Sequence, residues 1–430
     1  MRTAINQYVG NSNWRLFCFF VFLLPFLSVL NLPRFDLKVM GIGLGAFLTY
    51  LFAIGFFLPK LRFSFRVQKI IFLLGVLIVL LTVKFAISGS FVDLAKHIQS
   101  YLFVLIFYFF GSTYLNTNKK RSYLKLVFIN CAVLLAVVGI VHFHFFSHII
   151  LAYTAGFTNE LMGILDIENM KYRESATIPH PVHYAHILSF GIIFTVLCMR
   201  SQYKWLIVAT LLYAIIISGS RSALYYSLFF LFITQFNFRK TNRTGLLAVL
   251  IFALATVYFS NIYKTFDITN IYNSGIYIRV VKLQIAKQLL FENISNFLIG
   301  LPLEVRPAMD IPIFGNTSVN DNSYASILCE IGTVGFLILF LIVKKIHSRF
   351  KRLKEVEFDS DTANYINATK WCAISFLIFG LANSLHKSLF PTAFMSIFLG
   401  SVFNIRMKNN KYTENDGINK NHETHLESRP

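Results

Sequence analysis

Three arginines in separate segments of the chain are the residues best suited to bind an anion. Arg221 lies in a Ser-Gly-Ser-Arg-Ser sequence between two short apolar segments, Arg173 precedes a Pro-His-Pro sequence, and Arg279 lies in a long polar stretch. A guanidinium matches phosphate oxygens with a planar set of donors, and glycine and serine leave backbone amides available to assist it. If the three arginines meet on one side of the molecule, they would bind a diphosphate. Taken singly, each also suits a solvated loop charge or a cation that reaches water from a helix end.

Two acidic residues accompany the start of a later apolar segment. Asp321 stands where a helix N-cap is expected, a role that either following residue can share. Glu330 lies about two turns into the apolar segment, where a carboxylate is costly unless it is paired, for example with one of the arginines. A carboxylate within hydrogen-bond reach of a hydroxyl can act as a general base. Both acids are therefore candidate catalytic residues, and Gly332 and Gly335 would allow close helix packing beside them.

The histidines and cysteines do not predict a metal site. His180, His183 and His186 are spaced by three residues and would share one side of a helix, but the carboxylate near them is Glu174 alone. Zinc needs a defined set of ligands with hydrogen-bonded partners behind them, whereas polar residues inside a helical bundle are ordinary. The five cysteines are scattered singly. No phosphate-binding glycine loop or carboxylate-rich cation motif stands out, so we expect no cofactor.

The composition is that of a membrane protein. The 430 residues are 56% hydrophobic and 14% charged, whereas charged residues make up about a quarter of an ordinary soluble domain. The net charge of +20 does not indicate a nucleic-acid partner, because the lysines and arginines lie in short runs between apolar segments. Such runs are typical of the loops that join membrane helices. The expected partner of the chain's surface is the lipid bilayer.

Apolar segments long enough to cross a bilayer predict an all-α polytopic fold. A spanning helix needs roughly 20 mostly apolar residues, and this criterion predicts about twelve spans. They lie near residues 15–33, 38–58, 69–87, 98–115, 124–145, 182–199, 204–218, 221–236, 244–261, 323–343, 370–386 and 388–404.

Alternation of these spans brings the basic clusters to one side of the membrane. The clusters lie at residues 60–69, 119–125, 200–204, 239–243 and 344–354. Short cytoplasmic loops carry an excess of lysine and arginine, which predicts that both termini are cytoplasmic. The predicted divisions are a bundle of nine spans with a smaller periplasmic loop at 146–181, a large periplasmic loop, three further spans and a cytosolic tail. Their bounds are 1–261, 262–322, 323–405 and 406–430.

The large loop is predicted to place a helix on the membrane surface. Apolar residues are frequent between 278 and 290, and Arg279, Lys282 and Ala286 fall at positions i, i+3 and i+7 of one helical face. Gly300 and Pro302 end this segment. Loops of this length in a compact architecture are usually functional or disordered, and the apolar content favours a functional one.

Four segments, in this order, carry a resemblance to a known family. They are Arg173 to Ala185, Ser218 to Ala223, Arg279 to Ala286 followed by Gly300, and the set Asn322, Tyr324, Glu330, Gly332 and Gly335. The combination resembles the O-antigen polymerase and O-antigen ligase superfamily of bacterial membrane glycosyltransferases, over roughly residues 173–340. Ligases of this family usually carry a histidine directly before the asparagine that Asn322 matches. This chain has Asp321 there, as many polymerases do. It also has Leu283 in place of an aromatic residue and Pro302 in place of a glycine.

The resemblance implies a GT-C-like fold and a metal-independent transfer at the periplasmic face of the inner membrane. The donor would be a glycan on undecaprenyl diphosphate, and the acceptor another lipid-linked repeat unit for a polymerase or lipid A core for a ligase. Arg221 and Arg279, with Arg173, would hold the diphosphate beside Asn322 and Tyr324, and Asp321 or Glu330 would orient or deprotonate the acceptor hydroxyl. A flippase and a chain-length regulator are the protein partners that this role implies.

Two other classes of protein compete with this interpretation. A lipid-linked oligosaccharide flippase would also have many spans, but transporters often show internal repeats with matching broken helices. The sequence shows no such self-similarity, and its one large loop makes the halves unequal. A membrane scaffold that regulates chain length would leave the arginines without a task.

Overall fold

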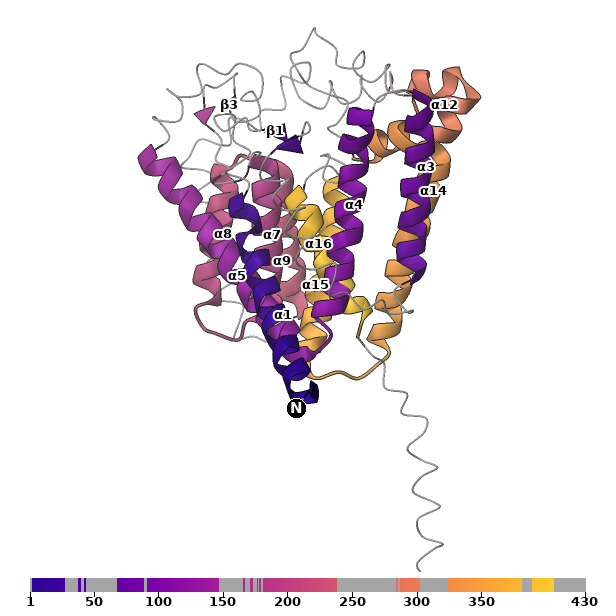
Figure 1. Cartoon of the computed structure of the whole chain (residues 1–430). Helices are drawn as coiled ribbons and strands as arrows, with labels where there is room; N and C mark the ends of the chain where they lie inside the picture. The colour runs from indigo at the N-terminus through magenta and orange to yellow at the C-terminus, as the bar shows by residue number, and fades with distance from the viewer. Residues whose placement is uncertain are drawn as a thin grey trace, which may run out of the picture.

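The structure is a computed structural model in which a defined part of the chain is described. The described residues are 2–27, 38–39, 42–43, 68–88, 91–146, 165–166, 171–172, 176, 178, 181–237, 284, 287–301, 323–380 and 389–405. Nearly all of these residues are helical, and the long helices run side by side (Figure 1). The predicted cytosolic tail and most of the large loop lie outside the described residues.

The helices follow one another with short turns wherever the connection is described. They are α1 (Arg2–Leu27), α3 (Gln68–Ser88), α4 (Phe91–Tyr114), α5 (Asn118–Val141) with the π-helical turn η6 (His142–Phe146), α7 (Pro181–Cys198), α8 (Lys204–Ile217), α9 (Arg221–Asn237), α12 (Ile294–Ile299), α14 (Ser323–Lys354), α15 (Ser360–Gly380) and α16 (Leu389–Phe403). The strands form two antiparallel pairs, β1 (Lys38–Val39) with β2 (Ile42–Gly43), and β3 (Leu165–Asp166) with β4 (Lys171–Tyr172).

The helices give the protein its membrane character. Among the described residues, 3 helices are long and apolar enough to cross a membrane, namely Asn118–Phe146, Pro181–Cys198 and Ile327–Lys354. Shorter apolar helices are Trp14–Phe26, Tyr101–Tyr114, Lys204–Ile217 and Phe390–Phe403. The prediction of a helical membrane protein is therefore confirmed. The predicted number of about twelve spans is larger than the number of described helices that are long and apolar enough to cross a membrane.

The predicted span at 38–58 is wrong at its start. Residues 38–43 contain the β1–β2 pair, in which Val39 is opposite Ile42. Glycines alternate with apolar residues after Met40, and glycine disfavours a helix by about 1 kcal/mol relative to alanine. A hydropathy criterion does not include this cost. The rest of that span, and the predicted span at 244–261, lie outside the described residues.

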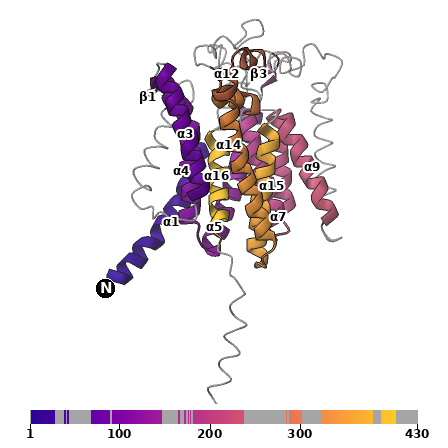
Figure 2. The same cartoon turned by 90° about the vertical axis from the view of Figure 1, so that its right-hand side faces the viewer.

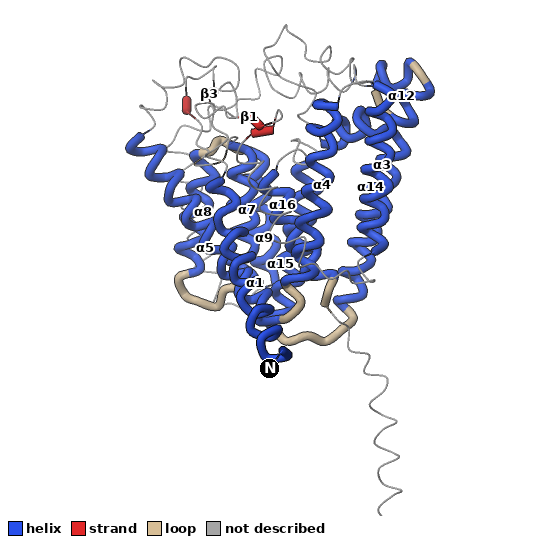
Figure 3. Tube along the Cα trace, viewed as in Figure 1, coloured by secondary structure: helices blue, strands red, loops and turns tan. Residues whose placement is uncertain are grey.

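The two ends of the bundle differ in what they carry. At the end near the amino terminus, the lower end, lie the turns that follow α4, α7 and α14 (Figure 3). The basic residues at 119–125, 200–204 and 344–354 lie at or near these turns. At the opposite, upper end lie the turn between α8 and α9, the start of α14 and the short helix α12, which covers the upper end of α14 (Figure 2).

The centre of the bundle depends on a close crossing of α4 and α16. A Cβ added at Gly111 would lie 2.1 Å from the carbonyl oxygen of Ile397, and one added at Gly400 would lie 2.0 Å from that of Tyr108. Small residues let membrane helices approach closely in this way. Beside the crossing, the Phe128 ring contacts aromatic rings from α7 and α16, at 4.9 to 5.5 Å between centroids. The main apolar core includes this crossing and extends over α1, α5, α7, α8, α9 and α15.

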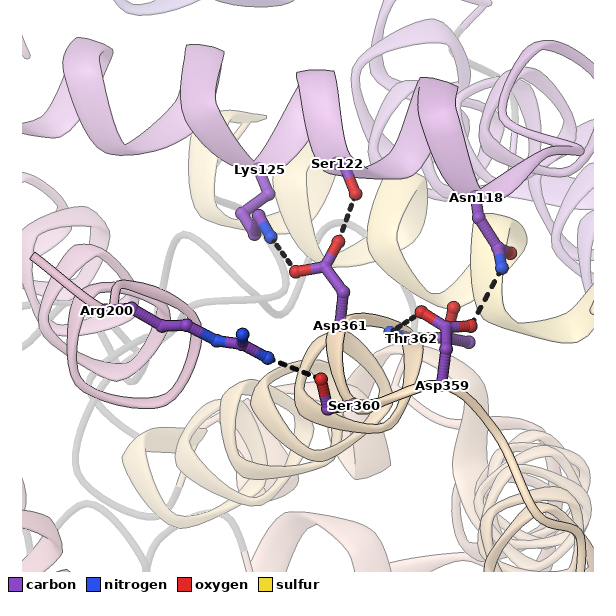
Figure 4. Close-up of polar contacts among 8 residues, drawn as sticks. All are labelled: Asn118, Ser122, Lys125, Arg200, Asp359, Ser360, Asp361 and Thr362. Atoms are coloured by element: carbon purple, nitrogen blue, oxygen red, sulfur yellow. Dashed lines mark hydrogen bonds and ion pairs between the residues drawn. The ribbon is translucent and has the colours of Figure 1, made fainter.

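A polar cluster ties three segments together at the lower end (Figure 4). The Asp361 carboxylate accepts hydrogen bonds from Ser122 and Lys125 of α5. Arg200, in the turn after α7, donates to the Ser360 hydroxyl at the start of α15. The helix pair α5 and α15 is thus joined by a charged contact outside the apolar core.

Asp359 adds a cap to the same cluster. Its carboxylate accepts from the backbone N–H of Thr362 at 3.1 Å and from Asn118 at 3.0 Å. The hydrogen bond from Thr362 lowers the pKa of Asp359. Burial acts to raise the pKa of Asp361, but the hydrogen bonds from Lys125 and Ser122 outweigh it, and the net shift is downward. Both carboxylates therefore stabilise the fold in their ionised form.

Replacing Gly111 by alanine should destabilise the protein by about 1 to 3 kcal/mol, because the new Cβ has to displace a backbone carbonyl of α16. Gly75→Ala is the matched control, since it also lies inside a helix and an added Cβ meets nothing within 4 Å. Thermal unfolding of both variants in detergent measures the difference. Equal melting temperatures would contradict the α4–α16 crossing.

Asp361→Asn should lower the unfolding free energy by about 1 kcal/mol at neutral pH, since the carboxylate is partly exposed and its ion pair is screened. The folded-state pKa is lowered, so the stabilisation is present above the unfolded-state pKa and is lost as the pH falls through the folded-state value. The deficit of the variant should therefore shrink below about pH 4. Glu357→Gln, an exposed acid in the preceding turn, is the control. A deficit that stays constant down to pH 3 would refute the ionic contribution.

Candidate functional site

The site is built where the short helix α12 meets an interruption in α14. The interruption is at Gly332, whose backbone has φ 64° and ψ −169° within a helix that otherwise continues. α12 ends at Ile299, and Gly300, which follows it, has φ 86°. Both positions require the left-handed φ that glycine adopts readily and other residues adopt at a cost. The backbone thus leaves the helical conformation at two glycines, both of which were marked by the sequence pattern.

At these glycines the two backbones are in direct contact. A Cβ at Gly332 would lie 2.3 Å from the carbonyl oxygen of Leu298, and one at Gly300 would lie 2.6 Å from that of Cys329. The N–H of Leu301 donates to the Cys329 carbonyl at 2.8 Å. The Thr333 hydroxyl donates to the carbonyl of Phe297 at 3.1 Å. α12 is therefore held on α14 by backbone contacts and one side-chain hydrogen bond, and neither glycine has room for a side chain.

Glu330 lies at this contact and is buried. The residue as a whole is only 3% exposed. The Tyr101 hydroxyl of α4 donates to its Oε2 at 3.3 Å. The Lys84 ammonium of α3 donates to the main-chain carbonyl of Glu330 at 2.6 Å and to that of Ile299 at 2.9 Å. We call this set, Lys84, Tyr101, Gly300, Glu330 and Gly332, the Glu330 junction, and it joins α3, α4, α12 and α14.

Apolar side chains enclose the Glu330 junction on two sides. Leu290, Leu301 and Cys329 form a small buried cluster on the side of α12. On the side of α3 a second cluster consists of Leu77, Leu81, Tyr101, Ile327 and Ile331. Hydrogen bonds and charges are stronger in such surroundings than in water, and leaving them unmade costs more. A change that displaces one of the polar groups of the junction is therefore expected to cost stability.

Arg221 lies at the same upper end of the bundle, as the first residue of α9. It is exposed, whereas Ser218 and Ser220 before it are buried. The turn is closed by Gly219, with φ 64°, and by the Ser218 hydroxyl, which donates to the carbonyl of Ile215 at 2.6 Å and accepts from the N–H of Ser220 at 3.3 Å. A guanidinium at a helix N-terminus on an exposed face is well placed to bind an anion.

Several predicted site residues lie outside the described part of the chain. They are Arg173, Arg279, Asp321 and Asn322. Tyr324 belongs to the first turn of α14, but its side chain is not among those described. The convergence of the three arginines therefore stays a prediction, and so does the role of Asp321.

Two of the described histidines contact aromatic residues. The ring of His186 packs on Phe379 with 3.9 Å between centroids, and His144 makes a hydrogen bond of 2.6 Å with the Tyr213 hydroxyl. Within the described ranges, no group of three or more His, Cys, Asp or Glu residues could hold a metal ion. His180 lies outside those ranges.

Lys84 and Tyr101 were not singled out by the sequence analysis. Lys84 did carry a signal, because it is a lone cation between apolar residues from 70 to 87, and ionisable residues in such segments tend to be functional or paired. Tyr101 carried none, since tyrosines are frequent in this chain.

Comparison with known proteins assigns no family. No family model matches the chain, and no curated protein matches it.

Gly332→Ala should loosen α12 from α14, because its Cβ would overlap the Leu298 carbonyl in a backbone conformation that alanine disfavours. The expected cost is about 1 to 3 kcal/mol of local stability. Limited trypsin digestion should then cut faster after the exposed Lys287, close to α12, while cleavage after Lys351 at the lower end keeps its rate. Gly75→Ala is again the control. Unchanged cleavage at Lys287 would argue against the glycine contact.

Proposed function

We propose that this chain is a surface-polysaccharide (O-antigen) polymerase of the bacterial inner membrane. It would transfer a glycan chain from undecaprenyl diphosphate to a new lipid-linked repeat unit at the periplasmic face. The observation that carries the proposal is a buried carboxylate, Glu330, held at the meeting of α12 and the interrupted α14. An exposed arginine, Arg221, lies at the same end of the bundle. Acidic and cationic groups at one membrane face suit the transfer of a sugar from a diphosphate.

The proposal includes the full topology expected from the sequence. About twelve spans would place the basic lower end in the cytoplasm, in keeping with the excess of lysine and arginine at cytoplasmic loops. The upper end, with the segments at 146–181 and 262–322, would then face the periplasm. A lipid-linked glycan that has already crossed the membrane would meet the site there.

In the proposed reaction one bond is exchanged for another. The oxygen of an acceptor hydroxyl attacks the anomeric carbon of the donor, and the bond from that carbon to the diphosphate oxygen breaks. The electron pair leaves with undecaprenyl diphosphate, and the hydroxyl proton passes to a carboxylate. Arg221, Arg279 and Arg173 would stabilise the charge that builds on the leaving diphosphate, an interaction that is stronger in the transition state than in the ground state.

The two candidate acids suit different tasks. Glu330 is almost completely buried and is held by Tyr101, which favours a role in orienting the site. Asp321, at the entry of α14 with Asn322 and Tyr324 beside it, is better placed in sequence to meet an acceptor from the periplasm and take its proton. This assignment uses the carboxylate that stands in the position where ligases carry histidine.

Arg221→Ala should reduce the polymer by about 100-fold or more, since loss of one charge-stabilising group commonly costs this much in rate. Arg221→Lys should restore part of it, because lysine retains the charge but loses the planar donor set. Arg279→Ala should behave as Arg221→Ala does. The measurement is the ladder of glycan lengths on lipid in cells, at equal protein level.

The control variant for this experiment is Arg352→Ala, an exposed arginine at the lower end of α14. It should leave the ladder intact. An unchanged ladder in the Arg221 and Arg279 variants would remove both residues from the mechanism.

The ligase is the second candidate, because the same resemblance covers it. Complementation separates the two enzymes. A strain that lacks the polymerase accumulates single repeats on the core, whereas a strain that lacks the ligase accumulates polymer on the carrier lipid. A flippase, the third candidate, would restore neither strain.

A further inference from the structure

Lys84 is a charged residue in an apolar part of α3, and its ammonium group binds two carbonyls from distant parts of the chain. One is the carbonyl of Ile299, the last residue of α12, at 2.9 Å, and the other is that of Glu330 in α14, at 2.6 Å. A lysine in a membrane helix usually extends its side chain toward the interface, where water solvates the charge. Lys84 is half-buried and uses its ammonium group to connect two other segments.

These carbonyls belong to the backbone groups that a helix end or a helix break leaves without their usual partners. The last carbonyls of a helix have no amide one turn further on. α12 ends at Ile299, directly before Gly300, and α14 is interrupted at Gly332, two residues after Glu330. In apolar surroundings such groups need other donors. The Lys84 ammonium group donates a hydrogen bond to each of these two carbonyls.

Two further hydrogen bonds described between the α12 segment and α14 are neutral. They are the Leu301 N–H to Cys329 carbonyl bond and the Thr333 hydroxyl to Phe297 carbonyl bond. Hydrogen bonds from a charged donor are shorter and roughly twice as strong as neutral ones. Lys84 also links both segments to a third helix, α3. It is therefore expected to contribute most to holding α12 in place.

We propose that Lys84 is a positioning residue that fastens α12 to the interrupted part of α14 and thereby holds Glu330 in place. Its relevance to glycan transfer rests on the proposed function. The fastening itself does not, because it follows from the hydrogen bonds of the Glu330 junction. Lys84 need not touch a substrate for this role.

The reactivity of two native cysteines can report whether α12 stays in place. Cys329 is 5% exposed beneath Leu290 and Leu301, so it should become reactive when α12 moves away. Cys131 is fully buried in the main core, where its thiol donates to the Phe22 carbonyl of α1, and it should react only when the whole bundle unfolds. Labelling of the full-length protein in detergent with a maleimide, followed by mass spectrometry, gives both rates in one sample.

Lys84→Met should accelerate labelling of Cys329 by about tenfold or more, since a charge-assisted hydrogen bond is lost from a local opening equilibrium. Cys131 should keep its rate. Lys84→Arg retains a cationic donor and should label nearly as the unchanged protein does. Lys69→Met, at the exposed lower end of the same helix, is the matched control and should have no effect. In the glycan ladder assay, Lys84→Met should lose polymer and Lys84→Arg should retain it.

Two results would overturn the inference. Unchanged labelling of Cys329 in Lys84→Met would show that Lys84 does not fasten α12. Equal acceleration of Cys329 and Cys131 would show that Lys84 supports the whole fold and has no local positioning role. If Lys84→Met does not accumulate, Lys84→Gln replaces the cation with a shorter neutral donor, and unchanged labelling of Cys329 there would also refute the proposal. Because labelling needs no activity, its outcome is separate from that of the Arg221 experiment.

Discussion

A helix that is interrupted inside an apolar bundle must find new hydrogen-bond partners for the backbone groups that the interruption releases. In this protein the interruption is at Gly332, and the partners come from outside the helix. Lys84 donates to the carbonyl of Glu330, and Leu301 donates to that of Cys329. The short helix α12 is drawn onto α14 by the same bonds. The positions of Glu330 and of α12 therefore depend on the donors that satisfy the backbone carbonyls at this interruption.

The two ends of the bundle are stabilised in different ways. At the lower end, Asp361 and Arg200 link α5, α15 and the turn after α7 by charged contacts between exposed or partly exposed groups. The centre is fixed by the α4–α16 crossing, where glycine brings the two backbones together. At the upper end the described polar contacts of Glu330 lie beside apolar clusters, where each hydrogen bond contributes more to stability than it would in water. The contacts at the lower end and the centre therefore hold the helices together, and the Glu330 junction lies at the upper end of these helices.

Hydropathy predicted the apolar helices, and the sequence marked Glu330 and Gly332 as unusual residues, but it did not predict their contacts. Hydropathy locates α5, α7 and α14, since a long apolar stretch has few other stable forms in a membrane. Glu330 and Gly332 were recognisable because an acid and a glycine are unusual in such a stretch. The partner of the Glu330 carbonyl was not, because Lys84 is 246 positions away along the chain and meets it only through tertiary packing. The β1–β2 pair was missed since hydropathy takes no account of glycine's preference for non-helical conformations.

Reconstitution of the purified protein tests the central functional claim most directly. The protein would be placed in liposomes with one undecaprenyl-diphosphate-linked repeat unit, with EDTA present, and the glycan lengths and free undecaprenyl diphosphate would be measured together. A polymerase of the proposed kind should produce longer lipid-linked glycans and release one undecaprenyl diphosphate for each bond formed. Glycans of unchanged length, whether they stay in place or cross the bilayer, would contradict the claim.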